Sequence, residues 1–311
     1  MRIAFVGNWG VSYSTEQHHA QALTDLGHNV LCLQEGVASA DEILGASRNC
    51  ELVVWVHTHG WETPGGIENA LLEIKLLGIP VITYHLDLWM GLERQKDMEA
   101  GPYWHLLDHF FTVDKIMADY LTEHTPIQGH YLPAAVAHRE CYAVRAPRDL
   151  DVVFVGSHNY HPEWAYRQEL IGKLRGGYGD RFHLFPGDNA PAVRGRDLNL
   201  LYARTKVVVG DTLCIGYDYP HYWSDRIYET TGRGGFLIHP KITGLETQFT
   251  SGEHLEFYDY GDFDQLFGLI DHYLYADYER EEIRAAGHSH THANHMYIHR
   301  WQTILDTLEL T

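Results

Sequence analysis

The sequence predicts an α/β protein made of two Rossmann-like domains that face each other across a cleft. Strand-sized apolar runs alternate with helical stretches from the first residue, and the alternation restarts after a polar linker at Arg145–Asp149. The chain of 311 residues is long enough for two domains of about 150 residues, each with its own core. These observations predict two parallel sheets covered by helices on both faces.

The first domain is expected over residues 1–147. Its first strand, Arg2–Val6, ends in a glycine turn, and a capping box at Ser14–Gln17 opens a helix that reaches Gly27. The same alternation then predicts strands at Asn29–Leu33, Leu52–Val56, Pro80–Tyr84, His109–Val113 and His130–Leu132, with helices at Ala40–Arg48 and Ile67–Leu77.

The second domain is expected over residues 148–290, followed by a tail over 291–311. Its expected strands are Asp151–Val155, Arg181–Phe185, Lys206–Val209, Phe236–His239 and a short one near His254–Phe257. Its expected helices are Glu163–Arg175, Asp197–Ala203, a helix in the segment Tyr222–Leu237, one beginning at Asp262, and a long helical stretch from Tyr278 to Leu310. In two such halves a ligand binds at the carboxyl ends of the strands.

Composition excludes several function classes. The net charge of −19 argues against general binding of nucleic acid or of anionic membranes, because such a chain repels polyanions. No apolar run approaches the roughly 20 residues of a membrane span. The four cysteines, Cys32, Cys50, Cys141 and Cys214, are far apart and lack metal-type spacing, which indicates buried thiols in a reducing compartment and a cytoplasmic location.

The segment Tyr222–Leu237 is the most informative part of the chain. It predicts a helix of about two turns that is opened by Ser224 as N-cap and stopped at Gly232, with Arg226 and Glu229 on one face. A helix N-terminus attracts phosphate, and a carboxylate one turn further can accept hydrogen bonds from ribose hydroxyls. The alternative is a capped amphipathic helix with an internal Arg–Glu ion pair.

The pattern Ser224-x-Arg226-x-x-Glu229, followed by glycine, resembles the donor-binding segment of GT-B glycosyltransferases. The resemblance is greatest to the CgeB-like branch and to glycosyltransferases of the family 1-4-like kind. It implies a nucleotide-diphosphate sugar as donor, a UDP-sugar foremost, and a tail that packs back across the two domains. The nucleotide-sugar-binding residues that it implies are Gly10, Gly156, Ser157, Ser224, Asp225, Arg226 and Glu229.

Two strand ends in the first domain carry candidates for the catalytic base that deprotonates the acceptor. His59 follows the strand Leu52–Val56, and Asp87 follows Pro80–Tyr84. A histidine or a carboxylate within hydrogen-bond reach of the acceptor hydroxyl suits this role, although each residue can equally be structural. His221 stands where many retaining members have a glutamate, so the resemblance implies neither retention nor a particular donor sugar.

The resemblance implies metal-independent transfer, with no cofactor beyond the donor, because a helix dipole and basic side chains neutralise the leaving diphosphate. The acceptor stays open between a glycan, a small molecule and a modified nucleobase. A non-hydrolysing sugar-nucleotide epimerase of the same fold is one alternative. A metal-binding enzyme is another, because His288, His292, His295 and His299 follow helical spacing, although no acidic residue accompanies them.

Overall fold

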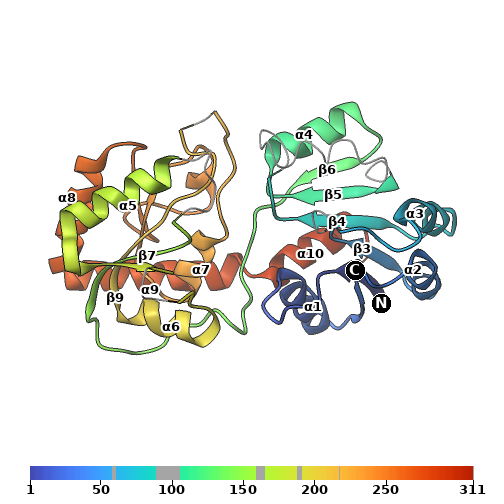
Figure 1. The fold of residues 1–311 in the computed structure, drawn as a ribbon, viewed down its shortest axis with the longest axis horizontal. Helices are drawn as coiled ribbons and strands as arrows, with labels where there is room; N and C mark the ends of the chain where they lie inside the picture. Colours follow the sequence, from blue (N-terminus) through green and yellow to red (C-terminus); the bar gives the residue numbers. More distant parts are fainter. Residues whose placement is uncertain (58–60, 89–105, 159–164, 188–190, 217, 311) are drawn as a thin grey trace. The chain divides into compact units, whose positions relative to one another are not determined.

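The computed structural model describes residues 1–57, 61–88, 106–158, 165–187, 191–216 and 218–310. It divides into two compact units (Figure 1): unit 1 is Met1–Ala134 with Tyr297–Thr311, and unit 2 is Ala135–Met296. The sequence led us to expect a boundary between residues 147 and 148 and a tail from residue 291. In the structure the units separate after Ala134, and the chain re-enters unit 1 at Tyr297.

Unit 1 contains a parallel six-stranded sheet with the order β2-β1-β3-β4-β5-β6. Its strands are β1 (Arg2–Gly7), β2 (Asn29–Gln34), β3 (Leu52–Trp55), β4 (Val81–His85), β5 (His109–Thr112) and β6 (Gln128–Tyr131). Its helices are α1 (Thr15–Asp25), α2 (Ala40–Ser47), α3 (Ile67–Leu76), α4 (Lys115–His124) and α10 (Tyr297–Thr307).

Alternate residues of the buried strands supply the two faces of this sheet. Val6 and Trp55 pack with α2, α3 and α4 in one apolar cluster. On the other face Phe5 contacts the ring of Trp301 from α10, and Trp301 donates its indole N–H to Nδ1 of His19 on α1 at 3.0 Å. Helices therefore cover both faces, as the sequence predicts, and the last helix of the chain completes the core of unit 1.

Unit 2 contains a parallel five-stranded sheet with the order β11-β10-β9-β7-β8. Its strands are β7 (Leu150–Val155), β8 (Phe182–Phe185), β9 (Thr205–Val209), β10 (Leu237–Pro240) and β11 (Glu256–Tyr258). Its α-helices are α5 (Ala165–Tyr178), α6 (Gly195–Arg204), α7 (Arg226–Gly232), α8 (Phe263–Tyr275) and α9 (Asp277–Asn294).

Both sheets share one topological feature that positions the sites. The first strand of each unit lies between the second and the third, so the connections leave in opposite directions at β1 and β3 and again at β7 and β9. In open α/β sheets such a switch point opens a crevice at the carboxyl ends of the strands. The loops that follow β1, β2 and β3 in unit 1, and those that follow β7, β8 and β9 in unit 2, are therefore the expected ligand-binding positions.

Two helical regions differ from expectation. Helix α4 was not predicted, because its buried residues Met117, Ala118 and Leu121 form only a narrow apolar stripe. The expected continuous helix from Tyr278 to Leu310 is wrong in one respect. It is broken at His295–Met296, so that α9 belongs to unit 2 and α10 to unit 1.

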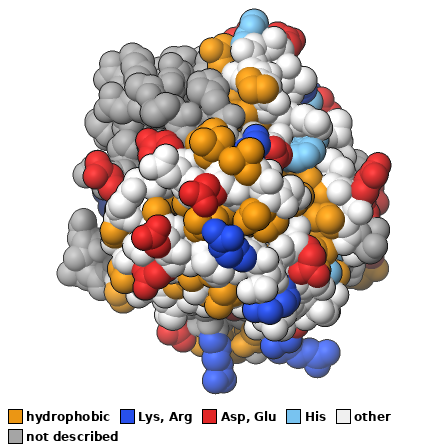
Figure 2. Space-filling view, turned by 90° about the vertical axis from the view of Figure 1, so that its right-hand side faces the viewer, with side chains coloured by type: hydrophobic (Ala, Val, Ile, Leu, Met, Phe, Trp, Pro, Cys, Tyr) orange, Lys and Arg blue, Asp and Glu red, His pale blue; other side chains and the backbone are white. Residues whose placement is uncertain are grey.

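The surface fits the composition. Figure 2 shows the face around α2 and α3, where acidic and basic side chains are mixed with apolar ones instead of gathering by sign. No helix in the described part of the chain is long and apolar enough to cross a membrane.

Candidate functional site

A buried ion-pair network lies at the carboxyl ends of β7 and β9 in unit 2. Asp211, two residues beyond β9, accepts from Nε and Nη2 of Arg167 on α5 at 2.6 and 2.9 Å. It also accepts from Nη1 of Arg226, the first residue of α7, at 3.3 Å. The side chains of Asp211 and Arg167 are 3% and 6% exposed, whereas that of Arg226 is 22% exposed. Asp211 therefore fixes a guanidinium that still reaches solvent.

Gly156 and Ser157 form the turn after β7, as predicted. A Cβ atom at Gly156 would lie 3.0 Å from the ring of Phe154 and 3.5 Å from Cζ of Arg226, so a glycine here lets Arg226 approach the backbone. Ser157 is exposed, and its carbonyl accepts from Nη1 of Arg167 at 3.1 Å. Arg226 and Arg167 therefore each contact both the turn after β7 and the carboxylate of Asp211.

The start of α7 differs from prediction. The helix begins at Arg226 with Asp225 at the N-cap position, and Asp225 makes no side-chain cap. The Ser224 hydroxyl accepts from the backbone N–H of Arg226 at 3.2 Å, and the N–H of Ser224 donates to the Thr212 hydroxyl at 3.0 Å. Ser224 therefore fastens the start of α7 to the loop after β9, one residue before the N-cap position.

Glu229 lies one turn into α7, as predicted, with 34% of its side chain exposed. Its partner is Arg233, whose Nη2 lies 3.4 Å from Oε1, so the internal ion pair with Arg226 considered as an alternative is not formed. Burial and the neighbouring Asp225 raise the pKa of the Glu229 carboxyl, against the opposing charge of Arg233. The carboxylate is thus oriented by a cation and remains open on one side.

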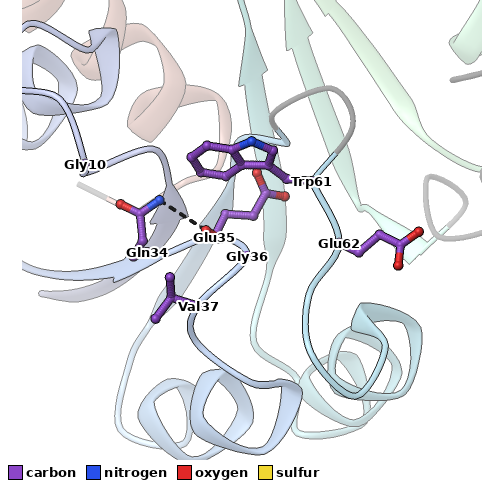
Figure 3. Close-up of a pocket in the computed structure, with 7 residues that line it drawn as sticks. All are labelled: Gly10, Gln34, Glu35, Gly36, Val37, Trp61 and Glu62. Carbon is purple, nitrogen blue, oxygen red and sulfur yellow. Dashed lines mark hydrogen bonds between the residues drawn. The ribbon is translucent and has the colours of Figure 1, made fainter.

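Gly10 lies in unit 1 and lines a pocket with residues from the ends of β2 and β3 (Figure 3). Its N–H donates to Oδ1 of Asn8 at 3.2 Å. The other six residues predicted to bind the nucleotide sugar lie together in unit 2, four of them in or just before α7 and two in the turn after β7.

Of the two proposed bases, His59 lies outside the described residues. Asp87 lies just beyond β4 with an exposed side chain, and its backbone carbonyl accepts from Nδ1 of the buried His85 at 3.1 Å. Burial lowers the pKa of His85, while the nearby Asp87 carboxylate acts in the opposite direction. Asp87 is therefore at the carboxyl edge of the unit 1 sheet, where the sequence predicts it.

The histidines of the tail have structural partners. Nδ1 of His288 and Nε2 of His292 both lie within hydrogen-bond distance of the Gly232 carbonyl, at 2.9 and 3.0 Å, and so cap the end of α7. His295 pairs with His290 at 3.2 Å. Within the described ranges no group of three or more His, Cys, Asp or Glu side chains is arranged to hold a metal ion.

Sequence reasoning missed Arg167, Asp211 and Glu35, the last a fully buried carboxylate in the pocket of unit 1. A signal existed for two of them, because Glu35 and Asp211 each follow an apolar strand within two residues. Lys206 is at the amino end of β9 and pairs with Asp151 at 2.7 Å, so it lies away from the site.

Comparison with known proteins shows a matching family and several structures of similar fold. The family model described as glycosyl transferase-like matches residues 141–306. An alpha-glucosyltransferase solved with UDP-glucose and DNA containing an abasic site is similar to this chain, with a TM-score of 0.69, 12% identity, and coverage of 99% of each chain. HepE of Anabaena, solved with UDP-glucose, has a TM-score of 0.66, 12% identity, and coverage of 100% of each chain.

Sucrose-phosphate synthase of Thermosynechococcus elongatus is also similar, with a TM-score of 0.62, 12% identity, and coverage of 99% of each chain. No curated protein matches the chain by sequence. At these identities the solved structures show a common fold, and the predicted GT-B type of two Rossmann-like units is confirmed. The assignment to the CgeB-like branch stays a prediction.

Proposed function

This chain belongs to the glycosyl transferase-like family and is a glycosyltransferase, and we propose that its donor is a nucleoside diphosphate sugar, specifically a UDP-sugar. In the transfer, the bond between the anomeric carbon and the diphosphate oxygen breaks, and a bond from that carbon to the acceptor oxygen forms. The nucleoside diphosphate leaves with the bonding electrons, and the acceptor proton passes to a base. The enzyme must therefore stabilise negative charge on the leaving diphosphate.

The observation that carries the proposal is the position of Arg226. Its guanidinium lies against Gly156 at the switch point of unit 2, is held by Asp211, and keeps part of its surface exposed. A guanidinium fixed in this way suits a diphosphate, because its planar N–H groups match phosphate oxygens and need no reorganisation during the reaction. The UDP-glucose complexes of structures with the same fold support this choice of donor. We propose that this arginine acts without a metal ion.

Glu229 is the proposed ribose ligand. Its carboxylate is one turn from Arg226 and is oriented by Arg233. Its exposed surface can accept hydrogen bonds from the two ribose hydroxyl groups. Gly156, Ser157, Ser224 and Asp225 complete the proposed donor site. Ser224 and Asp225 hold the start of α7, and the turn at Gly156 leaves space beside the arginine.

Unit 1 is proposed to present the acceptor, which is a glycan, a small molecule or a modified nucleobase. Asp87 is exposed at the carboxyl edge of its sheet and suits the role of the base that takes the acceptor proton. The four cysteines are free thiols, which supports the proposal of a cytoplasmic protein, although Cys32 is exposed and not buried as expected.

Calorimetric titration with UDP-glucose, GDP-glucose and uridine tests the donor site. Arg226→Ala should weaken the binding of UDP-glucose by about 1.5–3 kcal/mol, the usual contribution of a hydrogen bond to a charged group. The affinity for uridine, which has no phosphate, should stay unchanged. Arg204→Ala is the matched control, because Arg204 is 42% exposed and pairs with Asp149. Equal UDP-glucose affinity in Arg226→Ala and wild type would reject the assignment.

A second assay tests the reaction. UDP-glucose incubated with the enzyme alone should give at most slow release of UDP, and an added acceptor should accelerate it. Formation of an epimer of the UDP-sugar without acceptor would instead identify the protein as an epimerase.

A further inference from the structure

Unit 2 contains a pocket of about 250 Å³ at the carboxyl ends of its strands. Its walls come from the loop after β9, from the residues directly after β10, and from the residues after β11, three strands that are neighbours in the sheet. Ligands of parallel sheets bind at this edge. The volume is below the range of about 300–1,000 Å³ that is typical of sites for drug-sized ligands, so the pocket suits a single ring.

This pocket adjoins the start of α7, which belongs to the proposed diphosphate site. Thr212 lines the pocket, and its hydroxyl accepts from the backbone N–H of Ser224 at 3.0 Å. The hydroxyl of Ser224 in turn accepts from the backbone N–H of Arg226 at 3.2 Å. Tyr222, two residues before Ser224, also lines the pocket. Because two hydrogen bonds connect the pocket wall to Arg226, a ring attached to a diphosphate at this arginine can reach the pocket.

Contacts between the loops fix the walls of the pocket. The backbone N–H of His221 donates to the Thr243 carbonyl at 2.8 Å, which joins the loop after β9 to the residues after β10. Gly216, in the same loop, has a φ of 85°, and a Cβ atom there would collide with the hydroxyl of Tyr260. A glycine at this position therefore lets the Tyr260 side chain pack against the loop. A ligand meets a largely preformed surface.

Tyr260 supplies an aromatic face to the pocket. It lies two residues beyond β11 and is 52% exposed. Its ring centroid is 5.0 Å from that of Tyr166 on α5, which restricts the orientation of the exposed ring. An exposed aromatic ring on the wall of a small pocket offers a surface on which the apolar face of a sugar can pack.

Two exposed side chains of opposite charge, Lys241 and Asp218, line the same pocket. Among the described residues, neither side chain forms a hydrogen bond or an ion pair with another. An ammonium group only donates hydrogen bonds and a carboxylate only accepts them, whereas a hydroxyl group does both. A neutral polyol therefore satisfies both side chains, and an acidic sugar is attracted by Lys241 but repelled by Asp218.

We propose that this pocket receives the sugar of the donor and selects a neutral hexose over a uronic acid. The inference rests on the proposed UDP-sugar donor. The apolar face of the hexose packs on Tyr260, its hydroxyl groups donate to Asp218, and its oxygen atoms accept from Lys241. These three residues then determine donor specificity, and all three lie outside the α7 pattern from which the donor site was predicted.

Calorimetric titration of the full chain with UDP, UDP-glucose and UDP-glucuronic acid tests the inference. The wild type should bind UDP-glucose about fivefold more tightly than UDP-glucuronic acid, which corresponds to the repulsion between two like charges about 4 Å apart in water. Tyr260→Ala should weaken UDP-glucose by about threefold to tenfold and leave UDP unchanged, and Tyr260→Phe should retain most of the affinity. Tyr275→Ala is the matched control, because Tyr275 is 79% exposed in the same unit and does not line the pocket.

A charge variant tests the selection against uronic acids. Asp218→Asn removes the like charge from an exposed position, so the variant should fold normally and should bind UDP-glucuronic acid and UDP-glucose with affinities within about twofold of each other. Asp264→Asn is the matched control, because Asp264 is exposed on α8 and does not line the pocket. It should leave the fivefold preference of the wild type unchanged.

The outcomes separate the two proposals. Wild-type binding of UDP-glucuronic acid as tight as that of UDP-glucose overturns the inference, and so does an unchanged UDP-glucose affinity in Tyr260→Ala. If Arg226→Ala weakens both UDP and UDP-glucose while the pocket variants change neither, the inference fails and the proposed donor stands. If neither UDP nor UDP-glucose binds to the wild type, the proposed donor fails and the inference fails with it.

Discussion

Replacing Asp211 by asparagine should destabilise the protein far more than replacing Asp149 by asparagine. Both aspartates receive a two-pronged contact from an arginine, Asp211 at 2.6 and 2.9 Å from Arg167 and Asp149 at 2.8 and 2.6 Å from Arg204. The chemical change and the geometry are therefore matched. The difference is burial, with side-chain exposures of 3% and 6% in the first pair and 53% and 42% in the second.

Burial sets the size of the effect. Asparagine at position 211 removes the negative charge and one acceptor, and leaves the Arg167 guanidinium buried and underpaired, which costs about 3–5 kcal/mol. The exposed pair at Asp149 contributes at most about 1 kcal/mol, because water and salt screen it. For a domain of this size about 2–4 °C corresponds to 1 kcal/mol, so Asp211→Asn should lower the Tm of unit 2 by roughly 6–20 °C.

Differential scanning calorimetry of the wild type and both variants measures this difference. Urea midpoints at unchanged m values should follow the same order. If Asp211→Asn lowers Tm by no more than Asp149→Asn does, the Arg167–Asp211–Arg226 network does not stabilise unit 2 as its geometry indicates. Since the same network positions Arg226, UDP-glucose affinity should also fall in Asp211→Asn and stay constant in Asp149→Asn.

Three further predictions test other parts of the structure. Gly156→Ala should displace Arg226 and weaken UDP-glucose binding, as measured by calorimetry. The control Gly172→Ala, in a helix with no atom within 4 Å of the new Cβ, should instead raise the free energy of unfolding by about 0.5–1 kcal/mol. Equal effects of the two substitutions on UDP-glucose affinity would contradict the close approach of Arg226 to Gly156. Because the pKa of Glu229 is raised and ribose hydroxyls prefer the ionised carboxylate, UDP affinity should fall as the pH drops through that raised pKa. Glu229→Gln should remove this pH dependence of UDP affinity. The same pH dependence in Glu229→Gln and wild type would exclude the ribose contact. Burial lowers the pKa of His19 to about 3 from an ordinary 6.5, so the neutral imidazole contributes its full stability only at pH values above about 6.5. About 2 kcal/mol of the free energy of unfolding should be lost between pH 7 and pH 5. In His19→Gln the free energy of unfolding, measured in urea, should change correspondingly less over this pH range.

Much of the fold follows from local pattern. The strand expected at Leu52–Val56 is found at Leu52–Trp55, and the helix expected at Ile67–Leu77 is found at Ile67–Leu76, because buried parallel strands and amphipathic helices have distinct apolar periods. Helix α4 was not predicted because its apolar stripe is narrow. Its main sequence signal is the N-cap, where Asp114 accepts from the backbone N–H of Met117.

The candidate sites were predictable only where they are local. Gly156 follows its strand directly, and Arg226 and Glu229 share one helix, so a short local pattern and the family resemblance that it carries were enough to propose them. Arg167 and Asp211 are far apart in sequence and meet only when α5 packs against the sheet of unit 2, so no short pattern reveals the pair. The same applies to Glu35, which is brought to Trp55 and His57 by the order β2-β1-β3.

The two units show how one topology supports opposite chemistry. Each places the end of its first strand beside a helix-connected turn at a switch point. In unit 1 that turn receives the carboxylate of Glu16, and Glu35 adds a second acid. In unit 2 the corresponding turn at Gly156 receives the guanidinium of Arg226 instead. A fixed guanidinium favours a phosphate at the second turn, which is where we propose that the donor diphosphate binds.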